Sequence, residues 1–389
     1  MKVLVFMTQF YRLGGAERLQ VELAEALNKR DVHTDILSMY TEDLPGVSEA
    51  KRRLHNRGIP AVHFLGMRIH PPIASIFTAI LKLRRLIREH GYDIVETSML
   101  TPSAIASWAM QGMRARHVAG LHQVFRRDRE NSRQHKLWRA SVQCNRRIRY
   151  YAISDYAADH WIKYSRTSHQ HTRRIYNAIN CDCFAATPDR IEVRRELGIP
   201  EDGRLAIYVG RLASYKGIDT LLDALGPELE QNRLFLLYVG LPDLHVKGTK
   251  EMLEQMKQRV LEAPWGDRVK MLGYRVDVPR LMASADVLVH PTRLEGFGLT
   301  LAEAMAVGLP VVASSVEGIP EVLAGTDSLM IPADDPQALR AAVFKTLNLS
   351  PVEATLVIKK GRQRAQDFRL ARRTDEMIKL FEDVLSDRF

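Results

Sequence analysis

Short runs of apolar and β-branched residues alternate with segments of helical period along most of the chain. In the first half, such runs cover residues 2–7, 33–39, 93–99 and 116–122, and segments with apolar side chains every three to four positions separate them. Apolar runs of this length are typical of strands buried on both faces, and strands that alternate with helices form parallel sheets. The pattern therefore predicts an α/β protein whose parallel sheets are covered by helices on both sides.

The alternation pauses at residues 177–190, which show little periodicity and contain a proline, and then resumes. The later strand-like runs cover residues 204–210, 233–240, 268–274, 285–291 and 310–315. A pause of this kind is typical of a linker between domains. We therefore expect two Rossmann-like, doubly wound domains, over residues 1–180 and 181–370.

Residues 371–389 follow the second predicted domain. Met377, Ile378, Phe381 and Leu385 recur there at helical spacing and predict an amphipathic helix. This helix could cap an edge of the second sheet or cross back to the first domain.

Composition narrows the class of protein. The chain has 389 residues, of which 46% are hydrophobic and 26% charged, as in ordinary globular proteins. Its apolar runs fall short of the roughly 20 residues that span a bilayer, and its first ten residues are better explained by a strand than by a signal peptide. Three cysteines are too few for a disulfide framework. We expect a cytoplasmic protein.

Charge is unevenly distributed. The net charge is +10, and residues 110–175 alone hold 15 Lys and Arg against 4 Asp and Glu. A one-sided basic field attracts a polyanion or an anionic membrane surface, so the protein could be peripheral at the inner face of a membrane. The candidate contact residues are Trp138, Arg139, Arg146, Arg147 and Arg149.

The strongest chemical signal is the string EGFGLTLAE, from Glu295 to Glu303. It follows a predicted strand and runs into a helix. The free amides of Gly298, Leu299 and Thr300 can face an anion at the start of that helix. The two carboxylates flank this turn and can each accept hydrogen bonds from sugar or ribose hydroxyls.

A second signal is VGRLASYKG, residues 209–217, at the end of the first strand of the second domain. Ligands bind at such strand ends in open α/β sheets. Arg211 and Lys216 supply a guanidinium fork and an ammonium, which together can hold a diphosphate.

Two weaker signals lie in the first domain. Gly14 and Gly15 separate the first strand from the first helix and permit close approach of a phosphate or sugar. His122 ends a predicted strand and can donate a hydrogen bond to a sugar hydroxyl. The sequence lacks metal-binding and dinucleotide motifs, so we expect no metal or cofactor and a leaving diphosphate neutralised by Arg211, Lys216 and helix amides.

These strings together resemble the GT-B retaining glycosyltransferases of family 4, which share a VGRL-x3-KG phosphate loop and an E-x7-E signature. The resemblance extends over essentially the whole chain and implies a GT-B fold. It places catalytic roles on His122, Glu295, Arg211 and Lys216. Many relatives have Asp after the histidine, whereas this chain has Gln123.

The resemblance also implies how the donor is bound. Arg211 and Lys216 would hold the diphosphate, Glu303 the ribose and Glu295 the sugar, while residues 273–276 would cradle the base. The donor-binding positions are Gly14, Gly15, Arg211, Lys216, Tyr274, Arg275, Val276, Glu295, Phe297, Gly298, Leu299, Thr300 and Glu303.

The implied reaction transfers a sugar, with retention of configuration, from a nucleotide-diphosphate donor to an acceptor hydroxyl. A UDP-sugar is the default donor, and a lipid-linked or saccharide acceptor of cell-envelope polysaccharide or glycolipid assembly is expected. The alternatives are a sugar-nucleotide 2-epimerase, an inverting transferase, a phosphorylase with pyridoxal cofactor and a non-enzymatic basic binding protein. The arginines are not interleaved with aromatic residues as in nucleic-acid-binding surfaces, so no nucleic-acid partner is expected.

Overall fold

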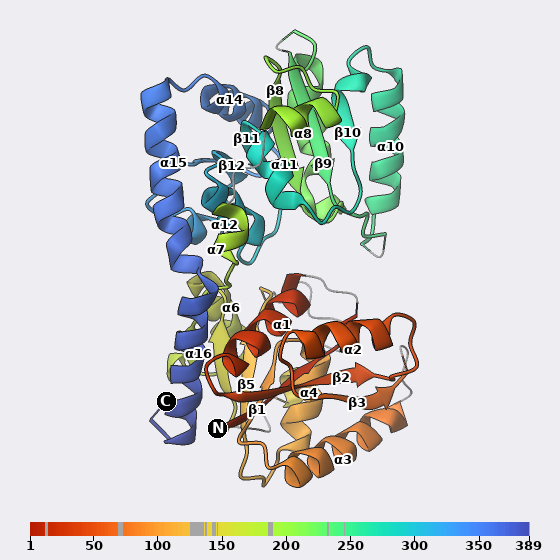
Figure 1. Ribbon diagram of the computed structural model, residues 1–389, viewed down its shortest axis with the longest axis vertical. Coiled ribbons are helices and arrows are strands. Elements are labelled where there is room, and N and C mark those ends of the chain that lie inside the picture. Colours follow the sequence, from red (N-terminus) through yellow and green to blue (C-terminus); the bar gives the residue numbers. More distant parts are fainter. Residues whose placement is uncertain are drawn as a thin grey trace. The chain divides into compact units, whose positions relative to one another are not determined.

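The computed structural model describes residues 1–11, 15–68, 73–124, 136, 138–141, 145, 147–185, 190–231, 233–244 and 246–388. The chain folds into two compact units (Figure 1). The first contains Met1–Ala178 together with Leu370–Phe389, and the second contains Ile179–Arg369. The sequence placed the division at residues 180 and 370.

A seven-stranded parallel sheet forms the centre of the first unit, in the order β3-β2-β1-β4-β5-β6-β7. Its strands are β1 Lys2–Met7, β2 His33–Tyr40, β3 Val62–Met67, β4 Ile94–Thr97, β5 Arg116–Leu121, β6 Arg149–Ala152 and β7 Thr172–Arg174. Its helices include α1 Gly15–Asn28, α2 Val47–Asn56, α3 Ile73–His90, α4 Leu100–Ala109 and α6 Asp155–Ser165. Side chains alternate across the strands, so Val3 and Val5 join one buried cluster and Leu4 and Phe6 the other.

The second unit has a six-stranded parallel sheet, in the order β10-β9-β8-β11-β12-β13. Its strands are β8 Arg204–Val209, β9 Leu234–Val239, β10 Val269–Met271, β11 Val287–His290, β12 Val311–Ser314 and β13 Leu329–Ile331. Its helices include α7 Cys181–Ala185, α8 Arg190–Glu196, α9 Ile218–Leu225, α10 Thr249–Glu262, α11 Val278–Ser284, α12 Leu299–Val307, α13 Ile319–Val322, α14 Pro336–Leu347 and α15 Pro351–Ala365. The predicted α/β class with two doubly wound parallel sheets is therefore confirmed.

Local sequence explains where several of these helices begin. Ser350 and Glu353 form a capping box at the start of α15, with Pro351 in the first turn. Asp335 caps α14 by accepting a hydrogen bond from the Ala338 amide, again ahead of a proline. These side chains satisfy amides that a helix leaves unpaired at its start.

The last helix, α16 Leu370–Leu385, packs on the first unit beside α1 and β5 (Figure 1). Met377 and Phe381 are fully buried in the first unit's core. Ion pairs of Asp375, Asp383 and Asp387 with three arginines of that unit surround this contact. The sequence allowed this helix either to cap the second sheet or to cross back to the first domain. In the structure it packs on the first unit.

The proposed membrane-contact residues include one that is buried. Trp138 is 1% exposed and packs against Trp161, with ring centroids 5.6 Å apart. The expectation that Trp138 contacts a membrane is therefore wrong, because an indole within an arginine-rich stretch has joined the core. Arg147 is exposed and Arg139 half-buried, whereas Arg146 lies outside the described residues.

No single helix in the described ranges is both long and apolar enough to cross a membrane. Helices α14 and α15 meet that criterion only as a pair, and they are bent by 107°.

Candidate active site

Two loops at the carboxyl ends of β8 and β11 carry the main candidate residues. Strand order reverses between these neighbouring strands, which is where open α/β sheets bind ligands. The Arg293 amide donates to the Tyr215 carbonyl at 2.8 Å, and the Arg293 guanidinium binds Asp219 through two hydrogen bonds of 3.0 Å. These contacts fasten the loop after β11 to the turn after β8.

Gly217 explains why the turn after β8 can approach β11 so closely. Its φ of 64° lies in the left-handed region, and a Cβ placed there would lie 1.9 Å from the carbonyl oxygen of Pro291. A larger residue would therefore push the two loops apart. The turn sets the position of Lys216, the residue before this glycine.

Lys216 and Glu295 form a mostly buried ion pair. The Lys216 Nζ lies 2.6 Å from the Glu295 Oε2, and their side chains are 12% and 19% exposed. His290 Nε2 lies 3.2 Å from the same oxygen. Burial opposes ionisation of Glu295, but the Lys216 ammonium and the His290 hydrogen bond outweigh it and hold the pKa of the carboxyl well below its usual range.

Arg211 lies on the same turn but is held by other partners. Its guanidinium contacts Asp243 Oδ2 at 2.5 Å and the Tyr215 hydroxyl at 2.8 Å, and its side chain is 64% exposed. An exposed guanidinium of this kind keeps donors available to an anionic ligand.

Helix α12 begins directly after the Glu295 loop. Gly298, with φ 86°, is its N-cap residue, and Leu299 and Thr300 form its first turn, as expected for a helix start that faces an anion. Phe297 is 1% exposed and packs edge-on against Phe368, so its side chain belongs to the core. Glu303 is 7% exposed.

Two residues around Glu295 were missed by sequence reasoning. The carboxylate of Glu317 accepts a hydrogen bond of 2.6 Å from the Glu295 amide and so holds the loop. His290 ends the apolar strand β11, and a lone polar residue in such a strand was the only signal that could have found it. Burial holds the pKa of His290 below its usual value, so the ring is neutral and its Nε2–H can donate to Glu295.

The proposed base-binding segment, residues 273–276, follows β10. Tyr274 and Val276 are 70% and 83% exposed. The Arg275 guanidinium is engaged by Asp277 at 2.7 and 2.8 Å. Its side chain is therefore fixed, and its neighbours remain accessible.

The remaining candidates lie in the first unit. Gly15 is the first residue of α1, and Gly14 lies outside the described residues. His122 directly follows β5, and its Nε2 lies 3.2 Å from the Tyr151 hydroxyl oxygen. Burial and the nearby positive charge of Arg373 lower the pKa of His122 to about 3, so its imidazole is neutral at physiological pH.

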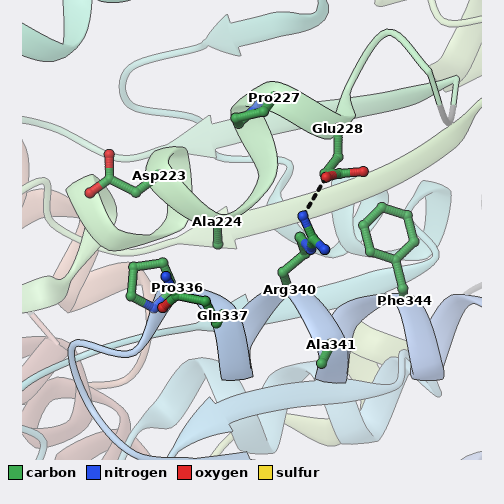
Figure 2. A pocket seen from close by; sticks show the side chains of 9 residues that line it. All are labelled: Asp223, Ala224, Pro227, Glu228, Pro336, Gln337, Arg340, Ala341 and Phe344. Carbon is green, nitrogen blue, oxygen red and sulfur yellow. Dashed lines mark hydrogen bonds and ion pairs between the residues drawn. The ribbon is translucent and has the colours of Figure 1, made fainter.

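One groove in the second unit is separate from these residues. A pocket of about 480 Å³ lies between α9 and α14, with the Glu228–Arg340 ion pair of 2.7 Å along it (Figure 2). None of the candidate site residues lines this pocket. Among the residues that the structure describes, no group of three or more His, Cys, Asp or Glu side chains is arranged to hold a metal ion.

Comparison with known proteins gives consistent matches for both halves. Residues 13–182 match the family described as Glycosyltransferase Family 4, and residues 189–364 match Glycosyl transferases group 1. A crystal structure of Anabaena HepE in complex with UDP superposes with a TM-score of 0.82 at 22% identity, covering 98% of this chain and 100% of that one. The fold is thus GT-B, as expected.

Several curated relatives match over shorter stretches. An uncharacterised glycosyltransferase of Methanocaldococcus jannaschii is 33% identical over 154 residues, 38% of this chain and 37% of its own length. The lipopolysaccharide core biosynthesis mannosyltransferase LpsB of Rhizobium meliloti is 31% identical over 182 residues, 44% of this chain and 49% of its own. The chain thus spans half or less of each of these two relatives.

Proposed function

Because the chain belongs to the group 1, or family 4, glycosyltransferases, we propose that it transfers a sugar from a nucleotide-diphosphate donor to an acceptor hydroxyl, with retention of configuration. The observation that carries this proposal is the Lys216–Glu295 ion pair at the ends of β8 and β11, beside the start of α12. The ammonium and the amides at the start of the helix could bind the diphosphate of the donor, and the carboxylate could accept hydrogen bonds from the hydroxyls of its sugar.

The ionisation of Glu295 determines what it can do. With a pKa well below its usual range, this carboxyl is a carboxylate at every working pH and cannot protonate a leaving phosphate. We assign it to sugar hydroxyls near the reacting carbon, where its negative charge also favours the positive charge that develops on the sugar. Glu303, mostly buried one turn further along α12, would accept hydrogen bonds from the ribose.

The departing diphosphate gains negative charge as the bond to the sugar loosens. Lys216, Arg211 and the first amides of α12 would stabilise that charge, and fixed donors aimed at developing charge lower the barrier most. The acceptor hydroxyl would then attack from the face that the diphosphate leaves and pass its proton to the leaving oxygen. In this scheme the protein needs no metal ion, and activity should persist in EDTA.

A UDP-sugar is the proposed donor. The similar Anabaena protein was crystallised with UDP and with UDP-glucose, which supports this choice. Residues 273–276, of which Tyr274 and Val276 are exposed, would contact the base of the donor. A sugar-nucleotide 2-epimerase remains the alternative enzyme, and release of free UDP with a glycosylated acceptor would distinguish the transferase from it.

The acceptor is proposed to be lipid-linked or a saccharide of the cell envelope, met at a membrane surface. The name of the Rhizobium relative supports this assignment. With Trp138 buried, α3 offers a better surface, because Phe77 and Leu81 are 66% and 51% exposed on the same helical stripe as the exposed Arg85 and Arg88. Retention on acidic liposomes, lost on replacing Phe77 and Leu81 by serine, would support it.

Ligand-induced stabilisation tests the proposed donor. UDP-sugars should raise the melting temperature of the protein more than GDP-, ADP- or dTDP-sugars, by a few degrees at about 100 times Kd, because a ligand bound only by the folded state stabilises it. Lys216→Met should abolish the shift and lower transfer at least 100-fold. Lys257→Met, at an exposed position of α10, is the control. Transfer that survives Lys216→Met unchanged would contradict the proposal.

A further inference from the structure

A buried polar cluster lies in the first unit against His122. It joins Gln20 of α1, Glu96 of β4 and Ser98 just after it, Tyr151 of β6 and Arg373 of α16. All five side chains belong to residues that are at most 5% exposed. Polar groups this deep are costly unless they are paired, and none of the five has a role in the function proposed above.

The hydrogen atoms of this cluster can be placed from its geometry. Glu96 Oε1 accepts the Tyr151 hydroxyl at 2.6 Å and the Ser98 hydroxyl at 2.7 Å. Each hydroxyl has one hydrogen, so both are committed to the carboxylate. The Gln20 amide then donates to the Ser98 oxygen and, at 3.2 Å, to the Tyr151 oxygen.

This arrangement determines the tautomer of His122. Its Nε2 lies 3.2 Å from the Tyr151 oxygen, whose only hydrogen points to Glu96, so that oxygen can only accept toward the ring. The Gln20 amide nitrogen is also 3.3 Å from Nε2, but its two hydrogens are already directed to Ser98 and Tyr151. The imidazole is neutral, with a pKa of about 3, and therefore carries its one hydrogen on Nε2. Nδ1 is left with a lone pair, and this buried atom has no partner within the described part of the chain.

We propose that Glu96 and Tyr151 are positioning residues that hold His122 as the Nε2–H tautomer, so that its Nδ1 accepts a hydrogen bond from a hydroxyl of the bound substrate. This inference rests on the proposed function for the identity of that hydroxyl, but not for the tautomer. It reverses the sequence-based expectation, in which the imidazole donates. It also explains Gly120, where a Cβ would lie 2.4 Å from the Tyr151 hydroxyl oxygen.

The charge of Glu96 controls the arrangement. The titratable groups around it are Tyr151 of β6, His122 after β5 and Arg373 of α16, whereas α1 contributes the neutral Gln20. Burial raises the pKa of Glu96 to about 7, against the opposing effects of the Tyr151 and Ser98 hydrogen bonds and of Arg373. A proton added to Glu96 near neutral pH weakens its hold on the Tyr151 hydrogen, which frees that hydrogen to turn toward His122.

Nitrogen NMR of the free protein, labelled with ¹⁵N-histidine, tests the proposal without any substrate. The His122 signals are identified by their loss in His122→Gln. At pH 8 we expect Nε2 protonated and Nδ1 unprotonated. Tyr151→Phe removes the acceptor and should shift the ring toward the Nδ1–H tautomer, because the Gln20 amide then becomes the donor to Nε2. Tyr150→Phe is the matched control, since that buried hydroxyl on the same strand has no partner among the described residues.

A pH titration of the His122 nitrogen signals tests whether the charge of Glu96 controls the arrangement. Because the pKa of His122 itself is about 3, any change in its nitrogen shifts between pH 6 and 8 reports a neighbour. We expect such a change in the wild type, with a midpoint near 7, and its loss in Glu96→Gln. An Nδ1–H ring in the wild type at pH 8, Tyr151→Phe with unchanged shifts, or a midpoint that survives Glu96→Gln would each overturn the proposal. A failure of sugar transfer would not alter these signals.

Discussion

The ionisation state of single residues in this protein depends on partners that are distant in the sequence. Glu96 and Tyr151 are 55 positions apart, and Lys216 and Glu295 are 79 apart, yet each pair is joined by a bond of 2.6 Å. Burial raises the pKa of both carboxyls, but their neighbours differ. Lys216 keeps Glu295 ionised, whereas Glu96 has no equally close cation among the residues that the structure describes and keeps its proton up to neutral pH.

Stability should reveal the buried charge of Glu96. Its pKa in the folded state, about 7, is above the unfolded value of 4.5, so the folded state holds this proton more tightly. Stability from this group is fully present below pH 4.5 and is lost as the pH rises to 7. The free energy of unfolding of Glu96→Gln, relative to that of the wild type, should therefore rise by about 3 kcal/mol between pH 4.5 and pH 8.

Urea unfolding of the two proteins at pH 4.5 and pH 8 measures this difference. Glu49→Gln, at a side chain 66% exposed in the same unit, should show almost no pH-dependent difference. An equal free-energy difference for Glu96→Gln at both pH values would contradict the assignment of the raised pKa.

At the scale of elements, much of the fold could be predicted from periodicity. Continuously buried strands such as β8 and β9 appear in the sequence as apolar runs, and the EGFGLTLAE string correctly placed a loop before a helix. The sequence pattern could not predict which distant residues each side chain contacts in the folded protein. Trp138 sits among arginines and looks exposed, and Glu96 looks like the polar position of a strand, but both are covered by distant elements. His290, Glu317 and the cluster around Tyr151 were missed for the same reason.

The turn between β8 and α9 should tolerate no side chain at Gly217. Gly217→Ala combines left-handed strain with a collision against the Pro291 carbonyl, and should destabilise the second unit by about 3 kcal/mol or more. Gly248→Ala is a matched control, because Gly248 also has a left-handed φ at a helix N-cap but has nothing within 4 Å of the added Cβ. It should cost about 1 kcal/mol. Chemical denaturation of both variants measures this contrast, and equal losses would contradict it.

At the scale of the whole molecule, the first unit is discontinuous in sequence. Its core includes Met377, Leu380, Phe381 and Val384 from α16, which follows the entire second unit along the chain. The amphipathic pattern of α16 was evident from the sequence, but such a pattern does not specify the surface that the helix covers. Only the three-dimensional contacts assign it to the first unit.

Truncation after Arg369 should therefore destabilise the first unit, although most of that unit lies far from the cut in sequence. Loss of four buried apolar side chains leaves a core surface uncovered, and each large-to-small change of this kind costs about 2–5 kcal/mol. Calorimetry should show that the transition of the first unit is lost while that of the second persists. Truncation after Ser386, which removes the Asp387–Arg116 ion pair but leaves α16, should shift the first transition only slightly. Loss of the second transition instead would contradict this division.

The discontinuous first unit has a consequence for biosynthesis. During translation, Met1–Ala178 emerges from the ribosome long before α16 does. Part of the apolar core of the first unit therefore stays uncovered while Ile179–Arg369 is translated and folds. The second half can thus reach its native state first, although it is made later. Chaperones that shield exposed apolar surface would be needed most during that interval, and completion of α16 would end it.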